Sequence, residues 1–94
     1  MYTVIRDRDS GKAHQLLELA RKENAFIITE DKRAFKVKAH GYGFDDVEIV
    51  DYEDLSQNNY PNKPALIHNV EKLLNWFFKR FEINVKGFSA TLND

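Results

Sequence analysis

The chain has 94 residues, of which 43% are hydrophobic and 13% aromatic, and its formal net charge is −1. This size and composition predict one folded domain spanning residues 1–94 and exclude an intrinsically disordered chain. The absence of cysteine excludes disulfides and thiolate metal sites, and the near-zero net charge provides no general attraction to nucleic acid. The sequence lacks an apolar stretch typical of a membrane span or a signal peptide, so we expect a cytoplasmic protein without a membrane partner.

The chain begins with a predicted strand, a polar loop and a helix. Tyr2–Ile5 is rich in β-branched and aromatic residues, and residues 6–10 are all polar. Apolar residues then repeat at helical spacing and predict a helix from Ser10 or Gly11 to about Asn24. A strand that leads through a Gly-Lys pair into a helix is typical of a phosphate-binding loop, in which backbone N–H groups and a lysine face the anion.

This loop matches the pattern G-x-x-x-x-G-K-[ST] only at its Gly-Lys pair. Arg6 stands at the position of the first glycine, and Ala13 stands at the position of the hydroxyl residue that binds magnesium. Asp7 and Asp9 add negative charge where a phosphate would bind. The candidate phosphate-binding residues are Arg8, Ser10, Gly11 and Lys12. In the alternative interpretation, the Gly-Lys pair only begins a surface helix.

Strands and helices alternate along the middle of the chain. Ala25–Thr29 predicts a strand that is buried on both faces, as in the interior of a parallel sheet. Residues 30–40 predict a second helix, although their apolar residues also alternate as in a strand. The expected inner face of this helix consists of Ala34, Phe35 and Val37 or Lys38. Gly41–Gly43 ends the element, Val47–Val50 predicts a shorter and more exposed strand, and Asp51–Leu55 predicts a helical turn capped by its first residue.

The last third of the chain predicts a loop, a strand, a helix and a closing strand or strand pair. Residues 56–63 are loop-like, and Pro64–His68 predicts a strand with proline at its first position. Asn69 can cap the last helix. The expected inward stripe of this helix consists of Val70, Leu73, Leu74, Phe77 and Phe81. Ile83–Lys86 and Phe88–Leu92 predict one broken strand or two strands.

Strands that alternate with helices predict an α/β fold. We expect a small three-layer sandwich, in which a mostly parallel sheet of four or five strands has helices on both faces. Right-handed crossovers would connect its parallel strands.

The predicted strand Pro64–His68 is the place where a nucleotide hydrolase would present an acidic residue to magnesium. A hydrolase of this architecture needs a phosphate site, a magnesium site and a group that orients water. The strand ends instead in His68 and Asn69, which lack the anionic oxygen that magnesium prefers. We expect His68 to make a hydrogen bond at the strand end and not to bind a metal. We therefore assign neither a catalytic residue nor a metal ligand.

Two charged segments and one aromatic segment are candidate binding surfaces. The acidic run consists of Asp45, Asp46, Glu48, Asp51, Glu53 and Asp54. The basic cluster consists of Lys32, Arg33, Lys36 and Lys38. Such charge segregation is typical of two solvated faces, but the acidic run is also a candidate surface for a basic partner. Trp76 and Phe78 flank the expected stripe of the last helix and would form a docking patch if both were exposed.

Several segments together resemble a group of small bacteriophage and prophage proteins related to P-loop nucleotide hydrolases. In that group an Arg-x-Ser-Gly-Lys-[Ser/Thr] loop leads into a leucine-rich helix, and a later apolar strand ends in acidic residues. The matching segments here are Arg8–Lys12 with the leucines that follow, Phe26–Ile28, Ala65–Leu74 and Lys86–Leu92. Because Ala13, His68 and Asn69 replace the magnesium-binding residues, the resemblance implies a P-loop-like fold with degenerate Walker A and Walker B motifs.

The resemblance and the residues together predict a protein that binds and does not catalyse. Our leading hypothesis is a non-catalytic phage or mobile-element protein in the host cytoplasm. It would bind a protein partner, such as a host enzyme or a defence protein, through the acidic run and residues 56–63. The first alternative is a nucleotide-binding protein or weak ATPase or GTPase, which would use Gly11 and Lys12 with ATP or GTP and magnesium. The second alternative is a nucleic-acid-binding accessory protein that uses the basic cluster, with strongly salt-sensitive binding.

Overall fold

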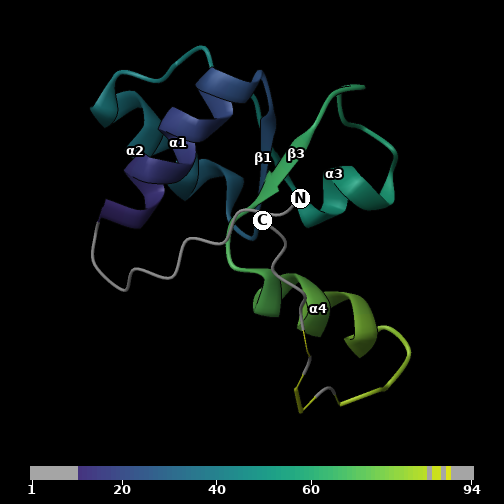
Figure 1. Ribbon diagram of the computed structural model, residues 1–94. Helices are drawn as coiled ribbons and strands as arrows, with labels where there is room; N and C mark the ends of the chain where they lie inside the picture. Colours follow the sequence, from purple (N-terminus) through teal and green to yellow (C-terminus); the bar gives the residue numbers. More distant parts are fainter. Residues whose placement is uncertain (1–10, 85, 88, 90–94) are drawn as a thin grey trace.

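A small parallel sheet lies at the centre of the computed structural model, which describes residues 11–84, 86–87 and 89 (Figure 1). The sheet has the order β2-β1-β3. Its strands are β1 (Phe26–Thr29), β2 (Ile49–Asp51) and β3 (Ala65–Ile67). Ile27 of the central strand pairs with Ile49 on one side and with Leu66 on the other. The predicted α/β class and parallel pairing are therefore confirmed.

The sequence predicts four or five strands, and the described part of the chain contains three of them. The expected strand Tyr2–Ile5 lies outside the described residues. Of the expected closing strands, residues 85, 88 and 90–92 also lie outside them. Ile83, Asn84 and Lys86 are described and do not belong to a strand.

Helix α1 (Gly11–Glu23) confirms the first predicted helix. Its buried residues recur every three or four positions: Ala13, Leu16, Leu17 and Ala20. Asn24 and Ala25 alone separate α1 from β1, so the helix and the strand run in opposite directions. Helix α1 therefore begins at the end of the sheet where β1 finishes (Figure 1).

Helix α2 (Lys32–Tyr42) confirms the helical interpretation of residues 30–40, and the alternative strand is wrong. The Asp31 side chain caps the helix by accepting a hydrogen bond from the Ala34 N–H at 3.0 Å. The helix continues two residues beyond the predicted end at residue 40, and it ends at Gly43, within the predicted Gly41–Gly43 break. Gly43 adopts a left-handed conformation with φ 85°, which glycine tolerates because it lacks a Cβ atom.

The inner face of α2 differs from the prediction. Phe35 and Ala39 are buried one turn apart, whereas Ala34, Val37 and Lys38 are exposed. Val37 is 73% exposed. Phe35 and Ala39, which are four positions apart, are the buried residues of this short helix. The alternation of Phe35 and Val37 in the sequence therefore does not correspond to a strand.

Strand β2 and helix α3 (Tyr52–Ser56) follow in the chain. The strand begins at Ile49, two residues later than predicted, and Ile49 and Val50 are buried, although we expected a more exposed strand. The predicted cap of α3 is confirmed. The Asp51 carboxylate accepts the Asp54 N–H at 2.8 Å, and the Asp54 carboxylate accepts the Asp51 N–H at 3.1 Å. These reciprocal bonds form a capping box.

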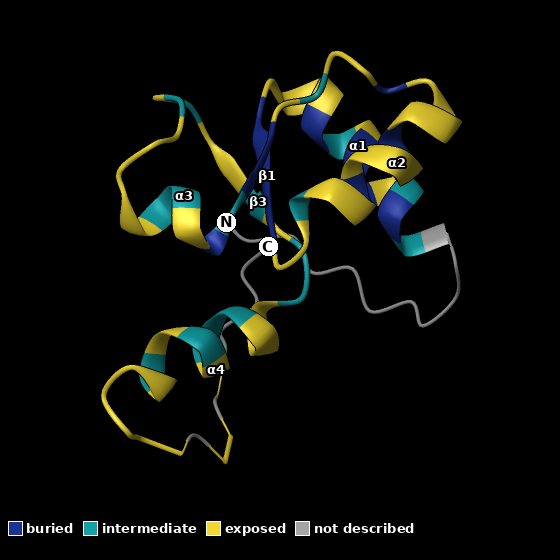
Figure 2. Ribbon diagram, turned by 180° about the vertical axis from the view of Figure 1, so that it is seen from behind, coloured by how far each residue is buried: buried dark blue, intermediate teal, exposed yellow. Residues whose placement is uncertain are grey.

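Helix α4 (Val70–Lys79) begins after β3 and is capped by Asn69, as predicted. The Asn69 residue has φ 63°, and its side-chain oxygen accepts the Lys72 N–H at 3.4 Å. The predicted inward stripe is only partly confirmed, because no residue of α4 is fully buried. Leu73 packs against the sheet, whereas Phe77 is 48% exposed. Figure 2 shows α4 in the colours of exposed and intermediate residues along its whole length.

The two faces of the sheet have separate apolar clusters. On the first face, α1 and α2 pack over Ile27 and Ile49, and together they form a closed buried cluster. On the second face, the buried residues are Phe26, Ile28, Val50 and Tyr52. Leu73 and Trp76 of α4 are only partly buried against this second cluster. We call these regions the α1–α2 side and the α3–α4 side.

Candidate functional site

The carboxyl ends of β1 and β3 form the candidate site. These strands are parallel neighbours, so they end at the same edge of the sheet. After β1 the chain enters α2 on the first face, and after β3 it enters α4 on the second face. Neighbouring strands whose connections leave toward opposite faces create a crevice, and open α/β sheets bind ligands there. We call this place the switch-point site (Figure 1).

Thr29 and His68 join the two strand ends. The Thr29 Oγ1 atom lies 3.2 Å from His68 Nδ1, and the threonine is 3% exposed. The Phe35 ring packs edge-on against the imidazole, with 5.0 Å between the ring centroids. The prediction that His68 makes a hydrogen bond at the end of the strand is therefore confirmed.

Three lysines from three helices act on the same imidazole. Burial lowers the pKa of His68, and the positive charges of Lys12, Lys38 and Lys72 lower it further. Lys12 is in the first turn of α1, Lys38 is in α2, and Lys72 is in the first turn of α4. The Lys72 Nζ atom is also 3.1 Å from a carboxylate oxygen of Glu30, which follows β1. Glu30 therefore offsets part of the positive charge near His68.

The structure brings one predicted phosphate-binding side chain to this site. Lys12 acts on His68, although 56 positions separate them in the sequence. Gly11 begins α1 beside it, and Arg8 and Ser10 lie outside the described residues. Sequence reasoning had treated Lys12 and His68 as unrelated, and it assigned Thr29 and Lys72 no role. Thr29 and His68 share one signal, a polar residue at or just beyond the end of an apolar strand, whereas Lys72 lies in the first turn of the following helix.

A second, open hollow lies at the carboxyl ends of β1 and β2. The lining residues are Glu30, Asp31, Lys32, Arg33 and Asp51. Asp31 and Asp51 cap helices, and Lys32 Nζ lies 2.8 Å from an Asp54 oxygen. The hydrogen bond from Lys32 lowers the pKa of Asp54. Most of these side chains therefore stabilise the loops that follow the strands.

The acidic run is divided by β2 into two groups. Asp45, Asp46 and Glu48 precede the strand at its amino end, whereas Glu53 and Asp54 follow it at its carboxyl end. Parallel strands keep these ends at opposite edges of the sheet. The six carboxylates are therefore not gathered at one edge.

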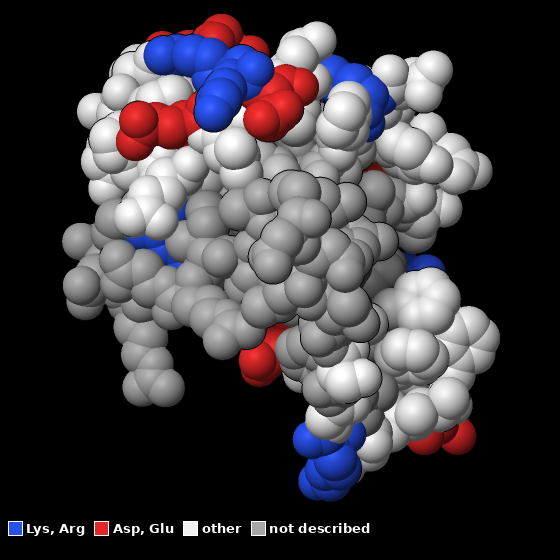
Figure 3. Space-filling view, in the orientation of Figure 1, with Lys and Arg blue, Asp and Glu red and all other residues white. Residues whose placement is uncertain are grey.

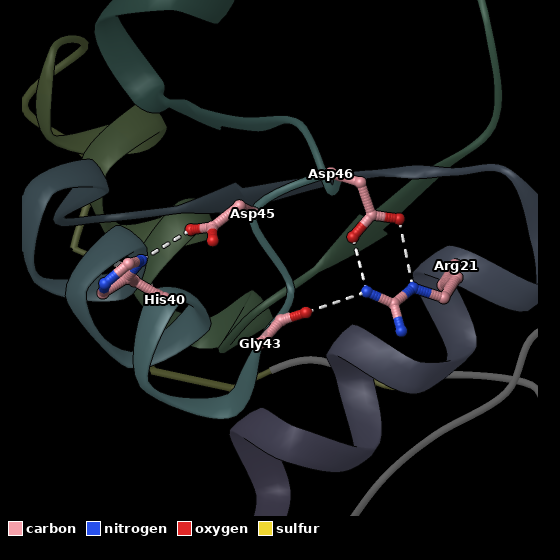
Figure 4. A network of polar contacts seen from close by, with 5 residues as sticks. All are labelled: Arg21, His40, Gly43, Asp45 and Asp46. Carbon is pink, nitrogen blue, oxygen red and sulfur yellow. Dashed lines mark hydrogen bonds and ion pairs between the residues drawn. The ribbon is translucent and has the colours of Figure 1, made fainter.

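Intramolecular partners hold both carboxylates of the Asp45–Asp46 pair (Figure 4). The Arg21 guanidinium contacts Asp46 through two nitrogens, and it also donates to the Gly43 carbonyl at 3.0 Å. This hydrogen-bonded pair lowers the pKa of Asp46 and raises that of Arg21. His40 Nδ1 lies 2.9 Å from an Asp45 oxygen.

The second group of the acidic run is paired as well. Glu53 lies 3.4 Å from Arg80, and Asp54 binds Lys32. In Figure 3, red and blue side chains adjoin one another near the top of the molecule and do not form a uniform acidic area. Within the described residues, three of the six carboxylates, Asp46, Glu53 and Asp54, therefore pair with an arginine or lysine. The role of the run in partner binding stays a prediction.

The described residues include neither a membrane-spanning helix nor a cluster of metal-ligand side chains. No helix there is long and apolar enough to cross a membrane. No group of three or more His, Asp or Glu side chains in this part of the chain is arranged to hold a metal ion. Comparison of the chain with protein-family models, curated proteins and solved structures found no match.

Proposed function

We propose that the chain is a non-catalytic protein with a P-loop-like fold, and that it binds a phosphate-bearing ligand such as a nucleotide at the switch-point site. One observation supports this proposal above all. The Thr29–His68 contact joins the carboxyl ends of β1 and β3, and α4 begins just beyond His68 with Lys72 in its first turn. Phosphate carries several negative oxygens, and converging ammonium groups stabilise such an anion where parallel strands end.

The proposed P-loop-like fold would have one more strand in the sheet, beside β3. Among the described residues, β3 pairs only with β1, so its outer edge is available to the proposed strand Tyr2–Ile5. A strand parallel to β3 would finish at the same edge of the sheet where α1 begins. Residues 6–10 would then connect it to Lys12 as a phosphate-binding loop.

A titration with nucleotide tests the proposal. We expect ATP or GTP to bind the wild-type protein in calorimetry, and we expect Lys12→Ala to weaken binding more than about tenfold, because a charged hydrogen-bond donor is lost. Lys22→Ala is the matched control, since Lys22 is exposed at the opposite end of the same helix. It should change the affinity less than about twofold. Equal affinity of Lys12→Ala and wild type, or the absence of binding at millimolar nucleotide, would contradict the proposal.

A second candidate function is binding of a protein partner, and the exposed apolar residues near the end of α4 favour it. Phe77, Phe81 and Ile83 are 48%, 61% and 52% exposed. Figure 3 shows uncharged side chains gathered near the C-terminal end of α4, with charged groups at their border. Apolar surface of this kind is typical of interaction sites. A host enzyme or defence protein as the partner rests on the phage resemblance alone.

Two multiple variants separate the possible contact surfaces of such a partner. We expect Phe77→Ser with Phe81→Ser to remove a partner that the wild-type protein captures quantitatively from host extract. A partner bound by the acidic run would instead be lost when Asp45, Asp46 and Glu48 are replaced by asparagine and glutamine. Retention of the same partner by both variants would contradict both surfaces.

A further inference from the structure

Helix α4 buries little of its apolar surface against the sheet. Leu73 and Trp76 pack against the second apolar cluster, and both are only partly buried. The Trp76 ring lies on the Tyr52 ring, with 5.4 Å between the two centroids. Because no residue of α4 is buried, the hydrophobic effect contributes less to its attachment than to that of α1 and α2.

Exposed ion pairs connect both ends of α4 to the rest of the protein. In the first turn, Lys72 Nζ lies 3.1 Å from a Glu30 oxygen, and just beyond the last turn Arg80 lies 3.4 Å from Glu53. The four side chains are between 49% and 63% exposed. Water and salt screen such pairs, so each contributes little to stability. The helix is therefore held by weak contacts at its ends as well as along its face.

The hydroxyl group of Tyr52 is buried in the cluster on which α4 packs. Tyr52 is 2% exposed, and among the described residues its hydroxyl has no hydrogen-bond partner. Burial raises the pKa of this side chain, so the hydroxyl keeps its proton at neutral pH. A hydroxyl that is buried without a hydrogen bond costs free energy, because the same group binds water when it is exposed. The closed arrangement of α4 therefore contains a destabilising group.

The chain changes direction at one residue between β3 and α4. The His68 N–H donates to the Ile28 carbonyl at 2.8 Å and connects the end of β3 to the sheet. Asn69 follows with φ 63°, in the left-handed region that asparagine tolerates better than most residues. Hinges are commonly residues at the ends of elements, where a change of φ and ψ disturbs few contacts. Asn69 is at such a position.

We propose that α4 is a lid on the α3–α4 side, that it opens as a unit about Asn69, and that the buried hydroxyl of Tyr52 favours its opening. In the open state, water would reach the hydroxyl and supply a hydrogen bond. In the closed state, the apolar contacts of Leu73 and Trp76 are retained. These effects oppose each other, so a small difference in free energy separates the two states. Opening requires no ligand and is independent of phosphate binding at the switch-point site.

Trp76 is the only tryptophan of the chain, so its fluorescence reports on the lid. The test is a urea titration of the full chain, followed by this fluorescence and by far-ultraviolet circular dichroism, to which α1 and α2 contribute most of the helical signal. We expect the fluorescence midpoint at a lower urea concentration than the circular dichroism midpoint, because the lid opens before the rest of the protein unfolds. Coincident midpoints in the wild-type protein would overturn the proposal.

Tyr52→Phe tests the role of the hydroxyl, because it removes this group and keeps the ring. It should lower the equilibrium constant for opening at least about fivefold, and so move the fluorescence midpoint to higher urea with little change in the circular dichroism midpoint. Tyr60→Phe is the matched control, because Tyr60 is 48% exposed and stacks on Phe26 of the same cluster. It should move neither midpoint. An unchanged or lower fluorescence midpoint in Tyr52→Phe would overturn the proposal, since the hydroxyl would then have a partner in the closed state.

Discussion

The two sides of the sheet differ in how completely their helices are buried. On the α1–α2 side, Leu17 and Ile27 are 0% exposed, and two helices close over the sheet together. On the α3–α4 side, the most apolar helix of the chain has no buried residue. The difference teaches that an apolar helical face shows which residues prefer burial, and not how much surface is present to bury them. Two helices that pack on each other and on the sheet bury more apolar surface than a single helix that packs on the sheet alone.

The largest expected effect is on the α1–α2 side. Leu17→Ala leaves a cavity in the closed cluster and should lower the free energy of unfolding by about 2–5 kcal/mol. Leu73→Ala makes the same chemical change on the partly buried face of α4, and it should lower that free energy by less than about 1.5 kcal/mol. Urea denaturation followed by circular dichroism measures both. Equal losses would mean that the two sides are equally well packed.

A medium effect is expected where α4 contacts the rest of the protein. The Trp76 ring lies 5.4 Å from the Tyr52 ring, and Arg80 stacks over it at 4.1 Å. Trp76→Ala removes both contacts and should lower the free energy of unfolding by about 1–2 kcal/mol.

Hydrogen exchange distinguishes a local effect of this change from a global one. In the Trp76→Ala variant, amides of α4 should exchange faster while those of α1 keep most of their protection. Phe77→Ala is the control, because Phe77 is half exposed, and it should change stability by less than about 0.5 kcal/mol. Equal acceleration of exchange in α1 and α4 would show that the two sides unfold as one unit.

The smallest expected effect is on the pH dependence of stability. Because the pKa of His68 is lowered in the folded protein, the unfolded chain takes up a proton first as the pH falls. The stabilising contribution is complete above the usual histidine pKa of about 6.5, and it is lost as the pH falls toward the folded value. His68→Gln should therefore lose less stability than wild type between about pH 7.5 and pH 5.5.

The carboxylates of Asp46 and Asp54 affect stability at lower pH, outside the range in which wild type and His68→Gln are compared. The lowered pKa values of Asp46 and Asp54 mean that their contributions are lost only below the usual aspartate range. Identical pH dependence of wild type and His68→Gln would contradict the lowered pKa of His68. Denaturant titrations at a series of pH values provide the comparison.

Local signals in the sequence predicted the elements, and the packing of α2 and α4 required the structure. Periodic apolar residues in α1 and the caps at Asp51 and Asn69 depend on nearby residues, so they were readable from the sequence. The exposure of Phe77 depends on which segments cover α4, which the pattern of α4 does not contain.

The candidate site was predictable only in pieces. Lys12 and His68 were each recognised from their neighbours in the chain. Their convergence depends on the strand order, because β3 pairs with β1 and not with β2, the strand that precedes it in the sequence. Strand order also brings Thr29 to His68, and no motif connects these two residues. The sequence places Lys38 in the basic cluster and, as an alternative to Val37, on the inner face of the helix, and it does not connect Lys38 with His68.

The contacts of His68, and not the conformation of Asn69, limit how an acidic strand end could arise here by mutation. The codons of histidine and asparagine each differ from those of aspartate by one base, so acidic residues at both positions are close in the genetic code. Asn69→Asp should be tolerated, because aspartate also caps helices and also adopts the left-handed conformation that φ 63° requires. His68→Asp would lose the contact with Thr29 and place a carboxylate against the Phe35 ring. Laboratory evolution toward a magnesium site would therefore accept the change at residue 69 before the change at residue 68.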